Sequence, residues 1–141
     1  MNITVEQRDD LVVLAPHGAL DAAGATDLQE RVTEVLERGE RRLVVDCGRV
    51  ETIGSAGIRL LLSLGTKLGS LGGALVLCAV GDGLRRALQL ARCAEKFEMA
   101  SDVAAAVRLH EEKARLQRLS SDALSLLLSA ERRGPREEPS S

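Results

Sequence analysis

The chain has 141 residues, which fits one domain with room for an extension. Apolar residues make up 45% of the sequence, and Phe97 is the single aromatic residue, so Leu, Val, Ile and Ala must fill the core. The aromatic platforms that bind single-stranded nucleic acid are missing from the sequence. A net charge of −2 gives no basic footprint either, so nucleic acid is not an expected partner.

The N-terminus and the cysteines bear on the cellular compartment. The first ten residues, MNITVEQRDD, are polar and acidic, unlike a signal peptide, and no apolar run approaches the ~20 residues of a membrane-spanning helix. Cys47, Cys78 and Cys93 are spaced singly and are interpreted as buried reduced thiols, so no metal or other cofactor is predicted. We expect a cytoplasmic, soluble protein that does not insert directly into a membrane.

The first elements form a predicted hairpin. Residues 2–6 and 11–15 are predicted as strands joined by a polar turn at residues 8–10. Pro16 and Gly18 should end the second strand, because proline lacks a ladder donor and glycine weakens a strand. The hairpin should supply an antiparallel edge to the sheet.

A helix, a strand and a second helix follow. The first helix is predicted from about residue 23 to 38, where apolar residues recur every three or four positions before Gly39. Residues 42–47 (RLVVDC) are typical of a short buried strand. A polar loop is expected over residues 48–52, before a second helix whose apolar face comprises Ile58, Leu61, Leu62, Gly65 and Leu68.

The remaining elements continue this alternation. After a turn at residues 72–73, residues 74–80 (ALVLCAV) predict a buried strand, and residues 84–91 predict a third helix. A short strand at residues 96–99 precedes a fourth helix over residues 101–109, which opens on a Ser-Asp capping signal. The order ββαβαβαβα predicts an α/β fold with about four helices and a mixed, largely parallel sheet of about four or five strands.

The C-terminal part differs from the domain predicted over residues 1–109. A helical extension is expected over residues 110–133, where Leu116, Leu119, Ala123 and Leu126 keep the spacing of a packing seam. This extra helix has three interpretations: folding back on the domain, self-association with a second copy, or docking on a partner. Residues 134–141 (GPREEPSS) are rich in Pro, Glu and Ser, which predicts a disordered tail.

The stretch from Asp46 to Leu62 delivers Ser55 to the start of a predicted helix. The first N–H groups of a helix lack intrahelical acceptors and carry partial positive charge, so they can meet a phosphate on Ser55. Gly54 and Gly57 keep the approach to the hydroxyl open. Taken alone, the same position is typical of a simple N-cap serine, and that interpretation stays open.

Enzyme motifs are not matched in this stretch. A nucleophile elbow needs GxSxG, with a glycine two residues before the serine. Here Gly54 comes directly before Ser55 and Ile53 stands at the required position, so the motif is not matched. A P-loop needs GxxxxGK[ST], which does not occur. The two histidines, His17 and His110, are distant from Ser55 in sequence. The sequence therefore predicts a protein that is not an enzyme, and a Ser55 nucleophile is the least favoured hypothesis.

The same stretch resembles the signature of the STAS family, the bacterial anti-anti-sigma factors. That signature is a strand ending in Asp, a loop, an apolar residue, and then Asp-Ser-[Ser/Thr/Ala]-Gly-[Leu/Ile] opening a helix. The matching residues are Asp46, Val50, Ile53, Ser55, Gly57 and Ile58. Residues 18–21 (GALD) resemble the family's Gly-x-Leu/Ile-Asp, and residues 72–73 before a strand also fit. The resemblance covers residues 1–109 and implies a STAS-like fold.

The resemblance also implies a function. In that family the Ser is phosphorylated by a partner kinase that is also the anti-sigma factor, and a protein phosphatase resets the switch. By resemblance, this chain is an anti-sigma-factor antagonist that binds an anti-sigma factor serine kinase while Ser55 is unphosphorylated, which frees a sigma factor for transcription. Ser55 would be the phosphorylation site, within a partner-binding set of Asp21, Gly54, Ser55, Ala56, Gly57 and Arg59.

Gly54 departs from the family pattern, because it stands where the family has Asp and so removes a polar partner for the Ser55 hydroxyl. This departure favours an alternative function, a non-catalytic STAS scaffold subunit of a membrane transporter or signalling assembly.

Two other residues of the partner-binding set each have two interpretations. Asp21 is either a helix cap or a partner-facing residue, and Arg59 is either a solvated charge or a partner contact.

Overall fold

The computed structural model describes residues 1–137, and the chain divides into two compact units, Met1–His110 and Glu111–Ser141. The first unit opens with the antiparallel strands β1 (Asn2–Arg8) and β2 (Leu11–Leu20). The turn between them contains Asp9, which has a φ of 48°, a left-handed conformation that Asp tolerates better than most residues. The predicted hairpin is therefore confirmed.

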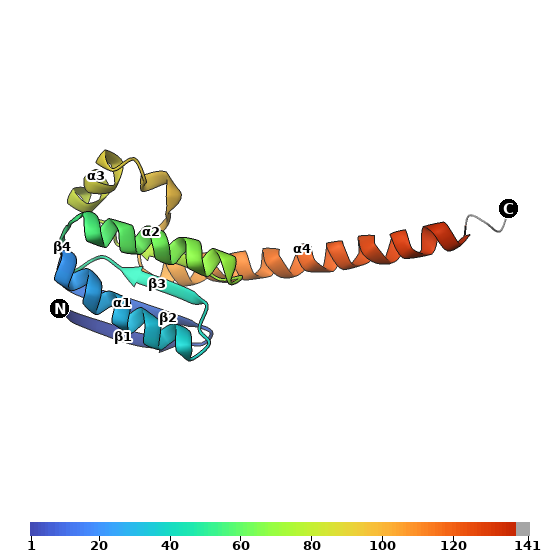
Figure 1. The fold of residues 1–141 in the computed structure, drawn as a ribbon, viewed down its shortest axis with the longest axis horizontal. Helices are drawn as coiled ribbons and strands as arrows, with labels where there is room; N and C mark the ends of the chain where they lie inside the picture. Colours follow the sequence, from blue (N-terminus) through green and yellow to red (C-terminus); the bar gives the residue numbers. More distant parts are fainter. Residues whose placement is uncertain (138–141) are drawn as a thin grey trace. The chain divides into compact units, whose positions relative to one another are not determined.

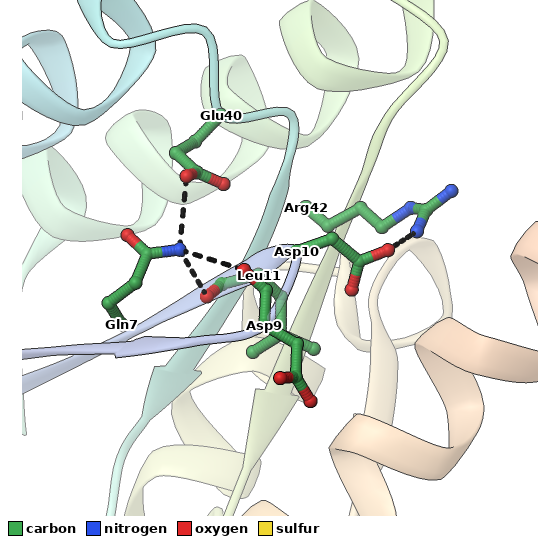
Figure 2. Close-up of polar contacts among 6 residues, drawn as sticks. All are labelled: Gln7, Asp9, Asp10, Leu11, Glu40 and Arg42. Atoms are coloured by element: carbon green, nitrogen blue, oxygen red, sulfur yellow. Dashed lines mark hydrogen bonds and ion pairs between the residues drawn. The ribbon is translucent and has the colours of Figure 1, made fainter.

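Polar side chains tie this turn to the strand that follows the first helix. The Gln7 amide Nε2 lies 3.2 Å from the carbonyl oxygens of both Asp9 and Leu11, and 3.0 Å from Oε1 of Glu40 (Figure 2). Arg42 forms an ion pair with Asp10 on the other side of the turn (Figure 2). These contacts are partly exposed and contribute modestly to stability, but they hold the hairpin in register with the neighbouring strand.

Strand β2 is longer than the sequence predicts, because Pro16 and Gly18 lie inside it rather than at its end. On the side away from β1, residues 12–14 pair with one strand and residues 18–20 pair with another. Pro16 lies between these two paired segments, where a missing N–H interrupts neither ladder. Gly18 has a φ of 103° and stands at a register shift, which is how a bulge re-aims the last part of β2.

Within residues 1–137 the sheet has six strands, one or two more than the predicted number of about four or five. The remaining strands are β3 (Arg42–Asp46), β4 (Val50–Ile53), β5 (Ala74–Cys78) and β6 (Glu98–Ala100). The strand order is β1-β2-β3-β5-β6, with β4 paired to β2, and every pair except β1 with β2 is parallel. Strand β4 lies where the sequence predicts a polar loop. The strand was not predicted because its residues are half-buried or exposed and form no apolar run.

Three helices pack on one face of the sheet: α1 (Ala22–Glu37), α2 (Ser55–Ser70) and α3 (Asp82–Leu90). A short 3₁₀ turn, η1 (Ala94–Lys96), follows α3. In Figure 1, α1 and α2 lie side by side. Their leucines, together with the valines of α1, pack in one core cluster with the inward residues Val12 and Leu14 of β2. The opposite face of β2 packs in a second apolar cluster that includes Ala106, from the start of the last helix.

The last helix, α4 (Val103–Glu137), is one continuous element where the sequence predicts a fourth helix ending near Leu109 and a separate extension. In the first unit its residue His110 is buried, with Nε2 2.8 Å from the carbonyl oxygen of Leu43. The helix passes Gly134, where the sequence predicts a disordered tail, and residues 138–141 of that tail lie outside the described residues.

In the second unit α4 carries exposed leucines. Leu116, Leu119 and Leu126 expose 55%, 57% and 72% of their surfaces. Leu124, Leu127 and Leu128 are also exposed, so the apolar surface is wider than the predicted seam. Over residues 1–137, no helix is both long and apolar enough to cross a membrane.

Candidate functional site

The parallel pairing of β2 with β4 brings the starts of two helices together. Leu20 pairs with Ile53 at the carboxyl ends of the two strands, and the next residues, Asp21 and Gly54, are the N-caps of α1 and α2. The N–H of Gly54 donates to the carbonyl oxygen of Leu20 at 3.0 Å. Asp21 and Gly54 are therefore neighbours across the strand pair, although 33 positions separate them in the chain (54 minus 21).

Ser55 is the first residue of α2 and its side chain is exposed. The interpretation of Ser55 as the helix cap is wrong, because Gly54 occupies the cap position and no side chain caps this helix. Among residues 1–137, the Ser55 hydroxyl has no hydrogen-bond partner. The hydroxyl is therefore accessible and uncommitted.

Asp21 caps α1 from an exposed position at the same surface. Its Oδ1 accepts a hydrogen bond from the Gly24 N–H at 2.8 Å, which satisfies one of the N–H groups that a helix start leaves unpaired. The capping interpretation of Asp21 is confirmed. Because the residue is also exposed, capping does not remove its charge from the surface that holds Ser55.

Gly57 allows α2 to approach the end of β2 closely. A Cβ at Gly57 would lie 2.7 Å from the Leu20 carbonyl oxygen and 2.9 Å from Cγ1 of Ile53, distances that real Cβ atoms do not adopt. Gly57 is buried, so its place in the predicted set is structural. The glycine is what allows the helix start, and Ser55 with it, to lie directly against β2.

Two other predicted residues of the partner-binding set lie on the first turns of α2. Ala56 is half-buried, whereas Arg59 is exposed and follows Ser55 by four residues, which places both on one side of the helix. Within the described part of the chain, Arg59 forms no ion pair. Its guanidinium is therefore available beside Ser55.

The loop before β4 is braced by Asp46. Its Oδ1 accepts a hydrogen bond from the Gly48 N–H at 3.0 Å, directly after β3. This turn leads the chain into β4, the element that aligns Ser55 with Asp21. The sequence does not predict β4. The strand is short and its residues are half-buried or exposed, so they give no strand signal by which it could have been found.

The three cysteines are buried and belong to the apolar core clusters. Burial raises the pKa of Cys47 from 9.0 to about 12, with further increases from the nearby Cys78 and Asp46. Burial also raises the pKa of Cys78 to about 11, again with the negative charge of Asp46 contributing, and then that of Asp102. Both thiols stay protonated at neutral pH, which suits packing rather than nucleophilic chemistry.

Catalytic and metal-binding arrangements are not formed by the described residues. Within residues 1–137, no group of three or more His, Cys, Asp or Glu side chains is placed to hold a metal ion. No hydrogen bond in this part of the chain joins Ser55 to a histidine. Nε2 of His17 lies 3.3 Å from Oγ1 of Thr4, and Nε2 of His110 lies 2.8 Å from the carbonyl oxygen of Leu43. The geometry gives no support to a Ser55 nucleophile.

The family model of the STAS domain matches residues 2–106. The chain belongs to the STAS domain family. BtrV of Bordetella bronchiseptica, a candidate anti-sigma factor antagonist by name, is 30% identical over 106 residues, which cover 75% of this chain and 91% of BtrV. The resemblance noted in the sequence is thus confirmed for the domain.

Solved structures show the same STAS fold. An anti-sigma factor antagonist from Mycobacterium paratuberculosis superposes with a TM-score of 0.70 at 26% identity, covering 78% of this chain and 93% of that one. A candidate antagonist from Thermotoga maritima gives a TM-score of 0.72 at 20% identity, covering 77% of this chain and 94% of that one, a likeness of fold alone. The predicted mixed, largely parallel α/β fold is confirmed.

Proposed function

We propose that this STAS protein is an anti-sigma-factor antagonist that binds a kinase-type anti-sigma factor while Ser55 is unphosphorylated. In this mechanism the bound anti-sigma factor releases its sigma factor, phosphorylation of Ser55 by the same kinase ends the interaction, and a phosphatase restores it. The protein acts by binding rather than by catalysis. The family membership and the antagonist names of its relatives support the general role.

One observation carries the proposal: the exposed, uncommitted hydroxyl of Ser55 lies at a helix start next to the exposed carboxylate residue Asp21. A kinase can reach this hydroxyl without unfolding any element of the domain. The surrounding set of Asp21, Gly54, Ser55, Ala56 and Arg59 lies at the start of α1 and along the first turns of α2, as one partner-facing surface requires.

Phosphate changes this surface by charge and bulk. It adds about −1.5 to −2 charges at Ser55. In the free protein, the unpaired N–H groups at the start of α2 and the exposed Arg59, four residues after Ser55, offset part of that charge. In a complex the phosphate must lose water beside the carboxylate of Asp21, which is a like charge. A hundredfold loss of affinity requires only ~2.7 kcal/mol, which one phosphate at an interface supplies.

The test compares Ser55→Ala and Ser55→Asp in titration calorimetry against purified kinase-type anti-sigma factors of the host. We expect Ser55→Ala to bind like the wild type and Ser55→Asp to bind at least tenfold more weakly. Ser63→Asp is the matched control, because Ser63 is an exposed serine two turns further along α2. If Ser55→Asp and Ser63→Asp both bind like the wild type, the proposed switch is wrong.

A second function is favoured by Gly54, which removes the acidic neighbour that the family signature places before the serine. In that case the chain is a non-catalytic scaffold subunit of a transporter or signalling assembly. Incubation with the same kinases and ATP, followed by mass spectrometry of Ser55, separates the two functions. Stable phosphate on Ser55 supports the switch, whereas an unmodified Ser55 together with co-purification of transporter subunits supports the scaffold.

For the C-terminal extension we keep the proposal that its exposed leucines dock on a partner or on a second copy of the chain. Leu116, Leu119 and Leu126 would each contribute when buried, at about 1.5–3 kcal/mol for a fully buried leucine. Sedimentation equilibrium of the full chain separates the two occupants. A concentration-dependent dimer supports self-association, and a monomer at all concentrations leaves partner docking.

A further inference from the structure

Gly54 leaves an empty side-chain position on the surface that holds Ser55. Its φ of −103° and ψ of −179° are extended backbone values that any residue adopts. A Cβ at Gly54 would lie 3.9 Å from the Leu20 carbonyl oxygen and 4.0 Å from the Asp21 Cα, which are ordinary van der Waals contacts. Neither the backbone nor the available space requires glycine at this position.

The contrast with two nearby glycines sharpens this point. A Cβ would lie 2.7 Å from the Leu20 carbonyl oxygen at Gly57, and 2.4 Å from the Ala19 carbonyl oxygen at Gly24. Both of those glycines are buried and are needed for the helices to approach β2, whereas Gly54 is exposed. Close packing therefore accounts for glycine at positions 24 and 57 but not at position 54.

We propose, on the basis of the proposed function, that Gly54 determines which anti-sigma factor this chain binds. The space that a side chain at position 54 would fill, here named the Gly54 gap, receives an uncharged side chain of the partner. The gap is bordered by Asp21, the N-cap of α1, and by Ser55, the first residue of α2. An anti-sigma factor shaped to meet a carboxylate at this position leaves the gap empty and its own donor groups unpaired, which weakens the mismatched complex.

The charge of the occupant follows from the direction of the switch. A Lys or Arg in the Gly54 gap would pair with Asp21, and it would also attract a phosphate on Ser55, so phosphorylation would tighten the complex. The proposed switch needs the opposite effect. An Asp or Glu would be repelled by Asp21 even before phosphorylation. An uncharged side chain is the occupant that allows binding before phosphorylation and loses it afterwards.

The experiment fills the gap with and without charge. Gly54→Asn and Gly54→Asp have the same shape, and both residues are good N-caps, so each variant should fold at least as stably as the wild type in thermal melts. Binding is measured by titration calorimetry against each purified kinase-type anti-sigma factor of the host. Gly69→Asn is the matched control, because an added Cβ at Gly69 on the same helix meets no atom within 4 Å.

We expect Gly54→Asn and Gly54→Asp both to lose about tenfold or more in affinity, equivalent to about 1.4 kcal/mol, while Gly69→Asn binds like the wild type. Wild-type affinity in both Gly54 variants overturns the inference. A loss in Gly54→Asp alone also overturns it, because charge rather than filled space would then be responsible. If wild type and Ser55→Ala bind none of these anti-sigma factors, the proposed function itself is wrong.

Discussion

The approach of α2 to the end of β2 makes Gly57→Ala a sharp test of the structure. Alanine normally stabilises a helix by about 0.5–1 kcal/mol relative to glycine. At Gly57, however, the new methyl group would lie 2.7 Å from the Leu20 carbonyl oxygen and 3.1 Å from the Leu20 Cβ. A backbone oxygen cannot move aside as a flexible side chain does, so the helix start must shift away from β2.

The magnitude follows from these opposing effects. Overpacking of a well-packed site costs about 1–3 kcal/mol, which outweighs the gain in helix propensity. The net expectation for Gly57→Ala is a loss of about 1–2 kcal/mol in the free energy of unfolding, or ~3–8 °C in Tm. Gly69→Ala lies in the same helix with no atom within 4 Å of the added Cβ, and should gain about 0.5–1 kcal/mol.

The assay is urea unfolding of the wild type and both variants, followed by circular dichroism. The opposite signs of the two changes are the essential result, since both replace glycine by alanine in α2. If Gly57→Ala is as stable as Gly69→Ala, α2 does not lie against the carbonyl of Leu20, and the arrangement described around Ser55 is refuted.

Two further predictions concern Asp21 and the buried thiols. Asp21→Ala should lower the free energy of unfolding by about 1 kcal/mol, because the helix cap is lost, whereas Asp21→Asn keeps a side-chain oxygen that accepts from the Gly24 N–H. Urea unfolding measures both variants, and equal losses would contradict the capping role of Asp21. The raised pKa values of about 12 for Cys47 and about 11 for Cys78 keep both thiols protonated in the folded chain above pH 9, where they ionise in the unfolded chain. Stability should therefore fall from pH 9 to 11, by up to about 1.4 kcal/mol per pH unit for Cys47 and by less for Cys78. Cys47→Ala should reduce that slope, and a flat profile would contradict the raised pKa values.

Local sequence patterns predicted most of the helices and the buried strands. Periodic apolar residues placed α1 and α3 within a few residues of their observed bounds, and the apolar runs of β3 and β5 identified buried strands. The length of β2 could not be predicted, since Pro16 is tolerated only because the strand changes partners there. Nor could the continuity of α4 be predicted, because the leucines from Leu116 onward are exposed and do not continue the buried pattern with which the domain ends.

Only the local part of the candidate site could be predicted from the sequence. A motif identified Ser55, and a resemblance connected it with Asp21, but neither predicts that the two helix starts are neighbours. That neighbourhood depends on the pairing of Leu20 with Ile53 through β4, a non-local contact between segments with weak strand signals. The uncapped state of α2 was equally hidden, because a serine at a helix start usually serves as the cap.

The glycines at this surface bear on how the proposed switch would act. Gly24 and Gly57 hold α1 and α2 against two consecutive carbonyl groups of β2, those of Ala19 and Leu20. Both helix starts therefore lie directly against the same strand end, which leaves little room for either start to shift when Ser55 is modified. Because the exposed hydroxyl has no hydrogen bond to lose in the described part of the chain, its modification disturbs little within the domain. Under the proposed function, the effect of phosphorylation would therefore arise in the interface, through charge beside Asp21 and bulk beside the Gly54 gap.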